Sequence, residues 1–170
     1  MVDGSGSDRR ASGYGWYVLI LLTAVHVLGY IDRWILSLLI EPIKADLGLN
    51  DFQIGLLLGP AFALLFITFG VPFGWLADRV ERRRLLAAGI ALWCLFTAGS
   101  CLAKDFPTLF LMRMGVGIGE AVLAPCAFSL IADFFPAMQR PRAVSIFMTG
   151  TFIGAGTAFL IGGPIITYLE

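Results

Sequence analysis

Four ionisable side chains interrupt long apolar stretches of this sequence. Asp32 and Arg33 are adjacent in the first stretch, and Arg113 and Glu120 lie in a later one. On insertion scales, each such group costs at least ~2.5–3.5 kcal/mol at the centre of a membrane helix. A carboxylate there can take up a proton, and a guanidinium group can bind an anion. We therefore expect Asp32 and Glu120 to handle protons, and Arg33 and Arg113 to face a cavity and meet an anionic substrate group.

The spacing of these residues limits how they can pair. Arg113 and Glu120 are about two helical turns apart, so they share a face but lie too far apart along the axis to pair with each other. Asp32 and Arg33 differ by about 100° around their helix and are not expected to face one partner squarely. His26 precedes Arg33 by seven residues and is a further candidate for the cavity. Two readings stay open: buried salt bridges that only fix helix packing, or a water-accessible site.

The composition restricts the class of protein. Of 170 residues, 58% are hydrophobic and only 14% charged, against about 25% in soluble domains. The 12 basic residues equal the 12 acidic ones, so no basic excess would attract a nucleic acid. With a mean hydropathy of +0.85, the chain is too apolar for a disordered or a soluble protein. We expect an integral, multi-pass protein of the lipid bilayer.

Charge-free runs indicate how the chain crosses the bilayer. They approach or exceed the ~20 residues that a membrane helix needs, whereas β-barrel strands would be shorter and alternating. Glu41-Pro42 is predicted to end the first helix, and Asn50-Asp51 supplies candidate N-caps for the second. The sequence thus predicts an all-α membrane protein with a flexible cytoplasmic tail over residues 1–15 and five transmembrane helices at about 16–40, 53–76, 84–103, 107–132 and 142–168.

The loop charges predict the orientation. With the N-terminus in the cytoplasm, eight arginines fall inside and two lysines, Lys44 and Lys104, fall outside. This bias follows the positive-inside rule and is compatible with a plasma (inner) membrane. The eight inside are Arg9, Arg10, Arg79, Arg82, Arg83, Arg84, Arg140 and Arg142.

Small residues predict close helix packing, and no pattern predicts catalysis. Gly150, Gly154 and Gly162 fall on a four-residue repeat that lets helices approach closely. The glycines before Glu120 do not make a dinucleotide loop, because Glu120 takes the third glycine position. No metal-ligand spacing and no nucleophile arrangement occurs, so we expect no cofactor, no metal and no enzymatic activity.

One loop resembles a known family. Residues 74–84 read Gly-Trp-Leu-Ala-Asp-Arg-Val-Glu-Arg-Arg-Arg, which resembles the GxLADRxGRR signature of the major facilitator superfamily, although Glu81 stands where that family often has Gly. Arg113-x-x-x-Gly117-x-Gly119 is similar to a second motif of the superfamily. Residues 30–33 (Tyr-Ile-Asp-Arg) and 117–121 (Gly-Ile-Gly-Glu-Ala) resemble its Spinster branch, whose members move lysolipids and sphingoid phosphates.

The resemblance implies roles for these residues. Asp32 and Glu120 would respond to protons, Arg33 and Arg113 would face the central cavity, and Gly117 and Gly119 would serve helix packing. A cytoplasmic charge cluster would hold one conformation closed. The charge cluster consists of Asp78, Arg79, Arg82 and Asp133, and the cytoplasmic gating motif around it also includes Gly74 and Arg83.

The resemblance also implies a fold and a function. The superfamily consists of two six-helix halves with substrate between them. The chain would be the N-terminal half truncated before helix 6, with the C-terminal half expected in cis or in trans. Its function would be secondary active transport, coupled to protons, of an amphipathic anion such as a lysolipid. The alternatives are an organic-anion or sugar-acid symporter and, from another class, an inactive membrane fragment or assembly partner with structural charges.

Overall fold

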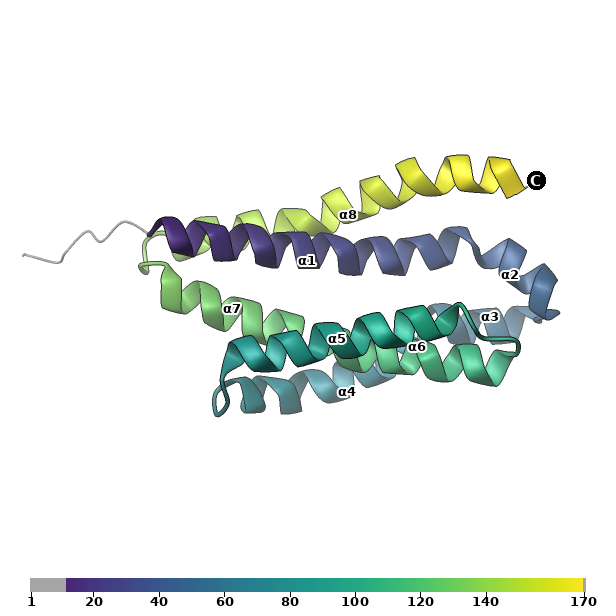
Figure 1. Ribbon diagram of the computed structural model, residues 1–170, viewed down its shortest axis with the longest axis horizontal. Helices are drawn as coiled ribbons and strands as arrows, with labels where there is room; N and C mark the ends of the chain where they lie inside the picture. The colour runs from purple at the N-terminus through teal and green to yellow at the C-terminus, as the bar shows by residue number, and fades with distance from the viewer. Residues whose placement is uncertain (1–11, 170) are drawn as a thin grey trace, which may run out of the picture.

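The computed structural model describes residues 12–169, with side chains as far as Pro164, and the described part contains helices and loops but no strand (Figure 1). Most of the predicted tail, including Arg9 and Arg10, lies outside the described residues, and the first helix already begins at Gly13. The helices in chain order are α1 (Gly13–Leu38), α2 (Ile40–Leu47), α3 (Asp51–Leu58), α4 (Pro60–Ala77), α5 (Arg82–Ser100), α6 (Phe106–Ala121), α7 (Leu123–Phe134) and α8 (Arg140–Leu169).

Prolines explain why the predicted helices 53–76 and 107–132 are each divided in two, and why a separate short helix follows the first one. A proline ring clashes with the carbonyl four residues before it and removes a helical hydrogen bond. Accordingly, α1 ends at Leu38, four residues before Pro42, and α6 ends at Ala121, four residues before Pro125. The prediction that Glu41-Pro42 ends the first span was therefore incomplete, because a short helix, α2, carries this pair in its first turn.

The second span starts as predicted and then breaks at a proline. The Asn50 side chain accepts a hydrogen bond from the Gln53 backbone N–H at 2.9 Å, and the Gln53 side chain accepts one from the Asn50 N–H at 3.0 Å. This capping box satisfies two backbone donors at the start of α3. Pro60 opens α4, and the residue before a proline is disfavoured in helical conformation, which separates α3 from α4.

Four segments of the described chain are long and apolar enough to cross a membrane. They are residues 13–38, 51–77, 106–134 and 140–164. The third predicted span, 84–103, corresponds to α5 and falls outside this set, since the 19 residues of α5 begin with three arginines. It nevertheless packs along α6 within the same bundle (Figure 1).

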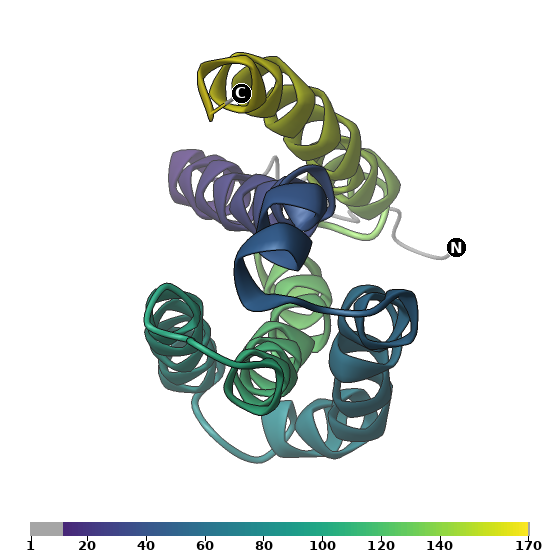
Figure 2. The ribbon, with the colours of Figure 1, turned by 90° about the vertical axis from the view of Figure 1, so that its right-hand side faces the viewer.

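The helices form two packed groups. In the end-on view of Figure 2, α1 and α8 lie side by side, and α6 lies between α4 and α5 in the other group. A buried apolar cluster from α1, α7 and α8 and the loop after α7 joins the groups at the end where α1 begins. Its buried members are Leu19, Leu22, Leu123, Ala127, Leu130, Ile131, Phe135, Ala143 and Phe147.

Glycines on α6 allow its central position. A Cβ atom on Gly117 would lie 2.7 Å from the Phe62 carbonyl oxygen of α4, and one on Gly119 would lie 2.6 Å from the Trp93 nitrogen of α5. Both neighbours are backbone atoms, which cannot rotate away. The α6 backbone therefore reaches a distance from α4 and α5 that a larger residue would prevent.

Glycines on α8 face α1 in the same manner. A Cβ atom on Gly150 would lie 2.9 Å from the His26 ring, and one on Gly154 would lie 2.7 Å from the Val27 carbonyl oxygen. Further along, one on Gly162 would lie 2.5 Å from a methyl carbon of Leu38. The four-residue repeat thus lies along the contact between α1 and α8.

We expect Gly119→Ala to destabilise the bundle by about 1–3 kcal/mol, because the added methyl group has no room between α5 and α6. The midpoint of thermal unfolding in detergent measures this loss. Gly156→Ala is the matched control, since a Cβ atom there meets nothing within 4 Å. Equal midpoints for the two variants would contradict the close packing described for α6.

Candidate functional site

Two ion pairs join α1 to α6. Arg113 donates from Nη1 to Asp32 Oδ2 at 2.8 Å and from Nη2 to the Asp32 carbonyl oxygen at 3.4 Å. Arg33 donates to Glu120 Oε2 from Nε at 2.9 Å and from Nη2 at 2.5 Å. Each helix thus contributes one acid and one base, and each base neutralises the acid of the other helix.

The directions of the two helices determine this pairing. They run antiparallel, and Asp32 of α1 lies opposite Arg113 of α6. Glu120 of α6 lies opposite Gly29, about one turn before Asp32 on α1, because a Cβ atom on Gly29 would lie 3.5 Å from Glu120 Oε2. Side chains lean toward the N-terminus of their helix, and the long Arg33 side chain reaches back to Glu120 in that direction. Asp32 and Arg33 do not face one partner residue: Asp32 pairs with Arg113, and Arg33 pairs with Glu120.

Burial differs among the four groups. Glu120 is 4% exposed and Arg113 is 6% exposed, and the side chain of Asp32 is 13% exposed. The side chain of Arg33 is 29% exposed. In a medium with few water molecules, separating any of these pairs costs several kcal/mol. Arg113 is therefore held in place by its pair, and Arg33 is the more accessible cation.

Two buried polar atoms of the quartet have no hydrogen-bond partner among the described residues. They are Oε1 of Glu120 and Nε of Arg113. Both hydrogen bonds from Arg33 reach the other oxygen of Glu120. A proton could therefore bind Oε1 without displacing Arg33, which is the geometry that a protonatable carboxylate needs.

Cavities reach the quartet from two sides. Arg33 and Arg113 line a cavity of about 100 Å³ beside α3 and α4, together with Leu57 and Phe62. Asp32 lines a separate cavity of about 460 Å³ between α1 and α5. The cavity beside α3 and α4 thus gives access to Arg33 and Arg113, and the cavity beside α5 gives access to Asp32.

His26 lies away from the ion pairs. Its Nε2 lies 3.2 Å from the Thr151 hydroxyl of α8, and its ring packs 4.3 Å from the ring of Phe147 between centroids. The predicted place of His26 in the cavity with Arg33 therefore differs from the structure, which puts it at the contact between α1 and α8. Tyr30 lies between them, with its ring centroid 5.0 Å from that of His26 and 5.0 Å from the Arg33 guanidinium carbon.

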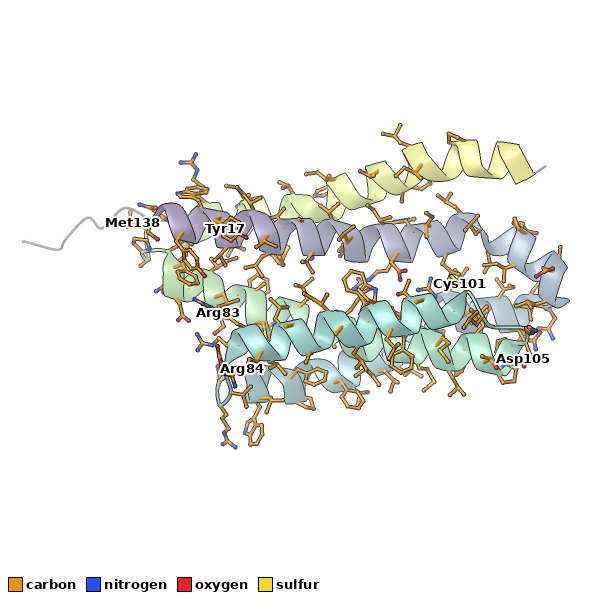
Figure 3. The ribbon with its side chains drawn as sticks, viewed as in Figure 1. Tyr17, Arg83, Arg84, Cys101, Asp105 and Met138 are labelled. Atoms are coloured by element: carbon orange, nitrogen blue, oxygen red, sulfur yellow. The ribbon has the colours of Figure 1, made fainter. Side chains whose placement is uncertain are left out.

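Arginines gather at one end of the bundle, where Figure 3 labels Arg83 and Arg84. There Arg82 forms an ion pair with Asp133 and also donates to the Ala77 carbonyl oxygen at 3.2 Å. Asp78 and Asp133 line one polar cavity of about 290 Å³.

Other members of the expected cytoplasmic cluster make different contacts. The Arg79 guanidinium lies 3.6 Å from the centroid of the Trp75 ring, and Arg83 lies 5.9 Å from that of Phe134. A Cβ atom on Gly74 would only touch Pro125 at 4.0 Å. No ion pair of Asp78 occurs within the described chain, so the structure joins only Arg82 and Asp133 in this cluster.

Aromatic residues around Arg33 are the part of the site that the sequence did not reveal. The guanidinium lies 4.4 Å from the centroid of the Phe62 ring and 5.0 Å from those of Phe66 and Tyr30. Tyr30 precedes Arg33 by about one helical turn, so helical spacing alone places the two side chains on the same face of α1. Phe62 and Phe66 come from α4, and only the packing of α4 against α6 brings them here.

Known proteins resemble this chain throughout most of its length. The family described as Major Facilitator Superfamily matches residues 22–170. Protein spinster homolog 1 from Rattus norvegicus is 33% identical over 90% of this chain and 29% of its own length. The "Probable L-galactonate transporter" of Escherichia coli (strain K12) is 36% identical over 82% of this chain and 31% of its own length.

A solved structure agrees with these relatives. The crystal structure of a bacterial homolog to the human lysosomal transporter Spinster, in an inward-facing and unoccupied conformation, superimposes with a TM-score of 0.86 at 38% identity, over 90% of this chain and 32% of that one. The chain thus spans about a third of the length of the relatives it matches. With its membrane-spanning helices, this chain is an integral membrane protein that belongs to the Spinster-like branch of the major facilitator superfamily and matches the N-terminal part of such a transporter.

Proposed function

We propose that this chain is part of a secondary active transporter that moves an amphipathic anion, such as a lysolipid, in exchange or together with protons. Arg33 receives the anionic group, Glu120 and Asp32 take up and release protons, and Arg113 holds Asp32 in place. Names of relatives support transport in general, since they include spinster homologs and a galactonate transporter. The C-terminal half of the carrier is expected in cis or in trans.

The observation that carries this proposal is the incomplete pairing of the buried quartet. If the charges served packing alone, every buried polar atom would be expected to find a partner. Instead, Oε1 of Glu120 has none among the described residues, and the partly exposed Arg33 lines a cavity. When a proton neutralises Glu120, Arg33 loses its counter-ion and becomes free to hold an anion. Anion and proton binding are thereby coupled through one guanidinium group.

We also propose an orientation in the membrane and a cytoplasmic gate. The arginine-rich end of the bundle is the cytoplasmic one, in a plasma (inner) membrane, with the N-terminus inside. The Arg82–Asp133 pair at that end then stabilises one of the two alternating conformations, as pairs that form in one state only can do. The resemblance assigns Asp78 and its neighbours to the same cytoplasmic cluster, which would hold one conformation closed.

A sugar-acid or organic-anion symporter is the second candidate. The relative named as an L-galactonate transporter favours it, because a small carboxylate would also fit the cationic cavity. Uptake assays of the full-length protein in proteoliposomes with a lysophospholipid and with L-galactonate separate the two. Sequencing the DNA downstream of codon 170 tells whether the second half follows in the same reading frame.

Glu120→Gln is expected to abolish the pH dependence of transport, because the amide keeps the shape of the side chain and can still accept from Arg33 but cannot take up a proton. Initial rates from pH 5 to pH 8, with protein abundance measured in parallel, test this. Glu41→Gln is the matched control, since Glu41 is exposed on α2. An unchanged pH profile in Glu120→Gln would exclude Glu120 as the coupling group.

Asp32→Asn is expected to lower the stability by about 3–5 kcal/mol, because it leaves Arg113 charged and buried without a partner. Asp32→Asn combined with Arg113→Gln should recover much of that loss. Thermal unfolding in detergent measures both effects, with the exposed Asp46→Asn as control.

The double variant also distinguishes transport from a purely structural role of the charges. If the quartet serves transport, the double variant is abundant and folded but no longer couples anion movement to a pH gradient. If the charges are structural in an inactive assembly partner, the double variant restores every property of the parent protein. That second outcome would overturn the proposed function.

A further inference from the structure

Arg33 is enclosed on several sides by aromatic rings. Phe62 and Phe66 stack on each other, with centroids 5.2 Å apart and planes at 23°, and both lie within 5.0 Å of the Arg33 guanidinium carbon. Tyr30 completes the enclosure from α1 at 5.0 Å. We call these three residues the aromatic cage. A cation near the faces of aromatic rings is attracted by their quadrupoles, most strongly where water is scarce.

The cage and Glu120 act on different parts of the guanidinium group. Glu120 accepts from Nε and Nη2, while Nη1 donates to no residue of the described chain. Arg33 lines the cavity of about 100 Å³, and so does Phe62. The charged groups around Glu120 are Arg33 and Asp32 from α1 and Arg113 from its own helix. The residues that face the site from α3 are leucines, and those from α4 are Phe62 and Phe66.

Building on the proposed function, we propose that Phe62 and Phe66 are positioning residues, which keep Arg33 in place and available to an anionic group in the cavity when Glu120 no longer neutralises it. A carboxylate would be a stronger partner, but it would also compete with the substrate anion. Aromatic rings stabilise the cation without competing, because they carry no net charge. The cage therefore lets Arg33 change its anionic partner without leaving its position.

The packing of α4 supports this role. The Phe62 backbone contacts α6 at Gly117, three residues from Glu120 in the sequence, so the rings and the ion pair have a fixed mutual position. A guanidinium that is held in advance loses less rotational freedom when it binds an anion. Losing the cage should therefore weaken anion binding while leaving the helices packed.

The test uses phenylglyoxal, which modifies arginine, on the protein in lipid nanodiscs, with peptide mass spectrometry at Arg33 and at Arg113. Phe62→Leu and Phe66→Leu should speed modification of Arg33 about three- to thirty-fold, as loss of a desolvated cation–π contact predicts. Arg113 should react at an unchanged rate. Phe62→Tyr should behave like the parent protein because it keeps the ring. Phe69→Leu is the matched control, since Phe69 packs on Phe73 of the same helix and its ring contacts no cation among the described side chains.

Transport distinguishes failure of the cage from failure of the proposed function. In proteoliposomes of the full-length protein, the two leucine variants should raise the KM for the transported probe, a lysophospholipid or L-galactonate, by a similar factor, and Phe62→Tyr should rescue it. If both leucine variants show the modification rates and the KM of the parent protein, the proposed role of the cage is contradicted. An equal effect of Phe69→Leu would contradict it as well. Absence of transport in the parent protein would overturn the proposed function, and the modification rates would still decide the role of the cage.

Discussion

Neutralisation of charge inside the bilayer is the constraint that the rest of this structure depends on. Each of α1 and α6 carries one acid and one base, and the acids and bases pair across the two helices instead of within one. Because an unpaired charge in lipid costs several kcal/mol, the two helices are fixed at one register and one rotation. The cavities and the aromatic cage of the site depend on this register of α1 against α6.

Small residues and prolines make that register possible. Glycines let α6 lie directly against the backbones of α4 and α5, which leaves Glu120 and Arg113 deep in the bundle. Pro125 ends α6 immediately after Glu120, and Pro42 ends the first helix soon after Arg33. The backbone breaks thus lie close to the paired charges, where a carrier that alternates between two conformations would need adaptable segments.

The two ion pairs have different properties although their chemistry is the same. The Asp32–Arg113 pair is buried, and Arg113 reaches both the carboxylate and the backbone carbonyl of Asp32, as expected of a fixed connection. Within the described residues, the Arg33–Glu120 pair leaves one carboxylate oxygen without a partner, and its cation is partly exposed among aromatic rings. This asymmetry agrees with the proposal that Arg33 is the cation that changes its anionic partner.

The sequence by itself determined the class, the membrane helices, the family and the identity of the four charged residues, because these depend on local hydropathy and on short motifs. It also restricted the pairing, since Arg113 and Glu120 lie too far apart on one helix to neutralise each other. Only the tertiary structure decided which acid meets which base, that His26 packs on α8, and that Phe62 and Phe66 enclose Arg33. These contacts join residues far apart in the chain, and they depend on helix register and rotation, which no local pattern specifies.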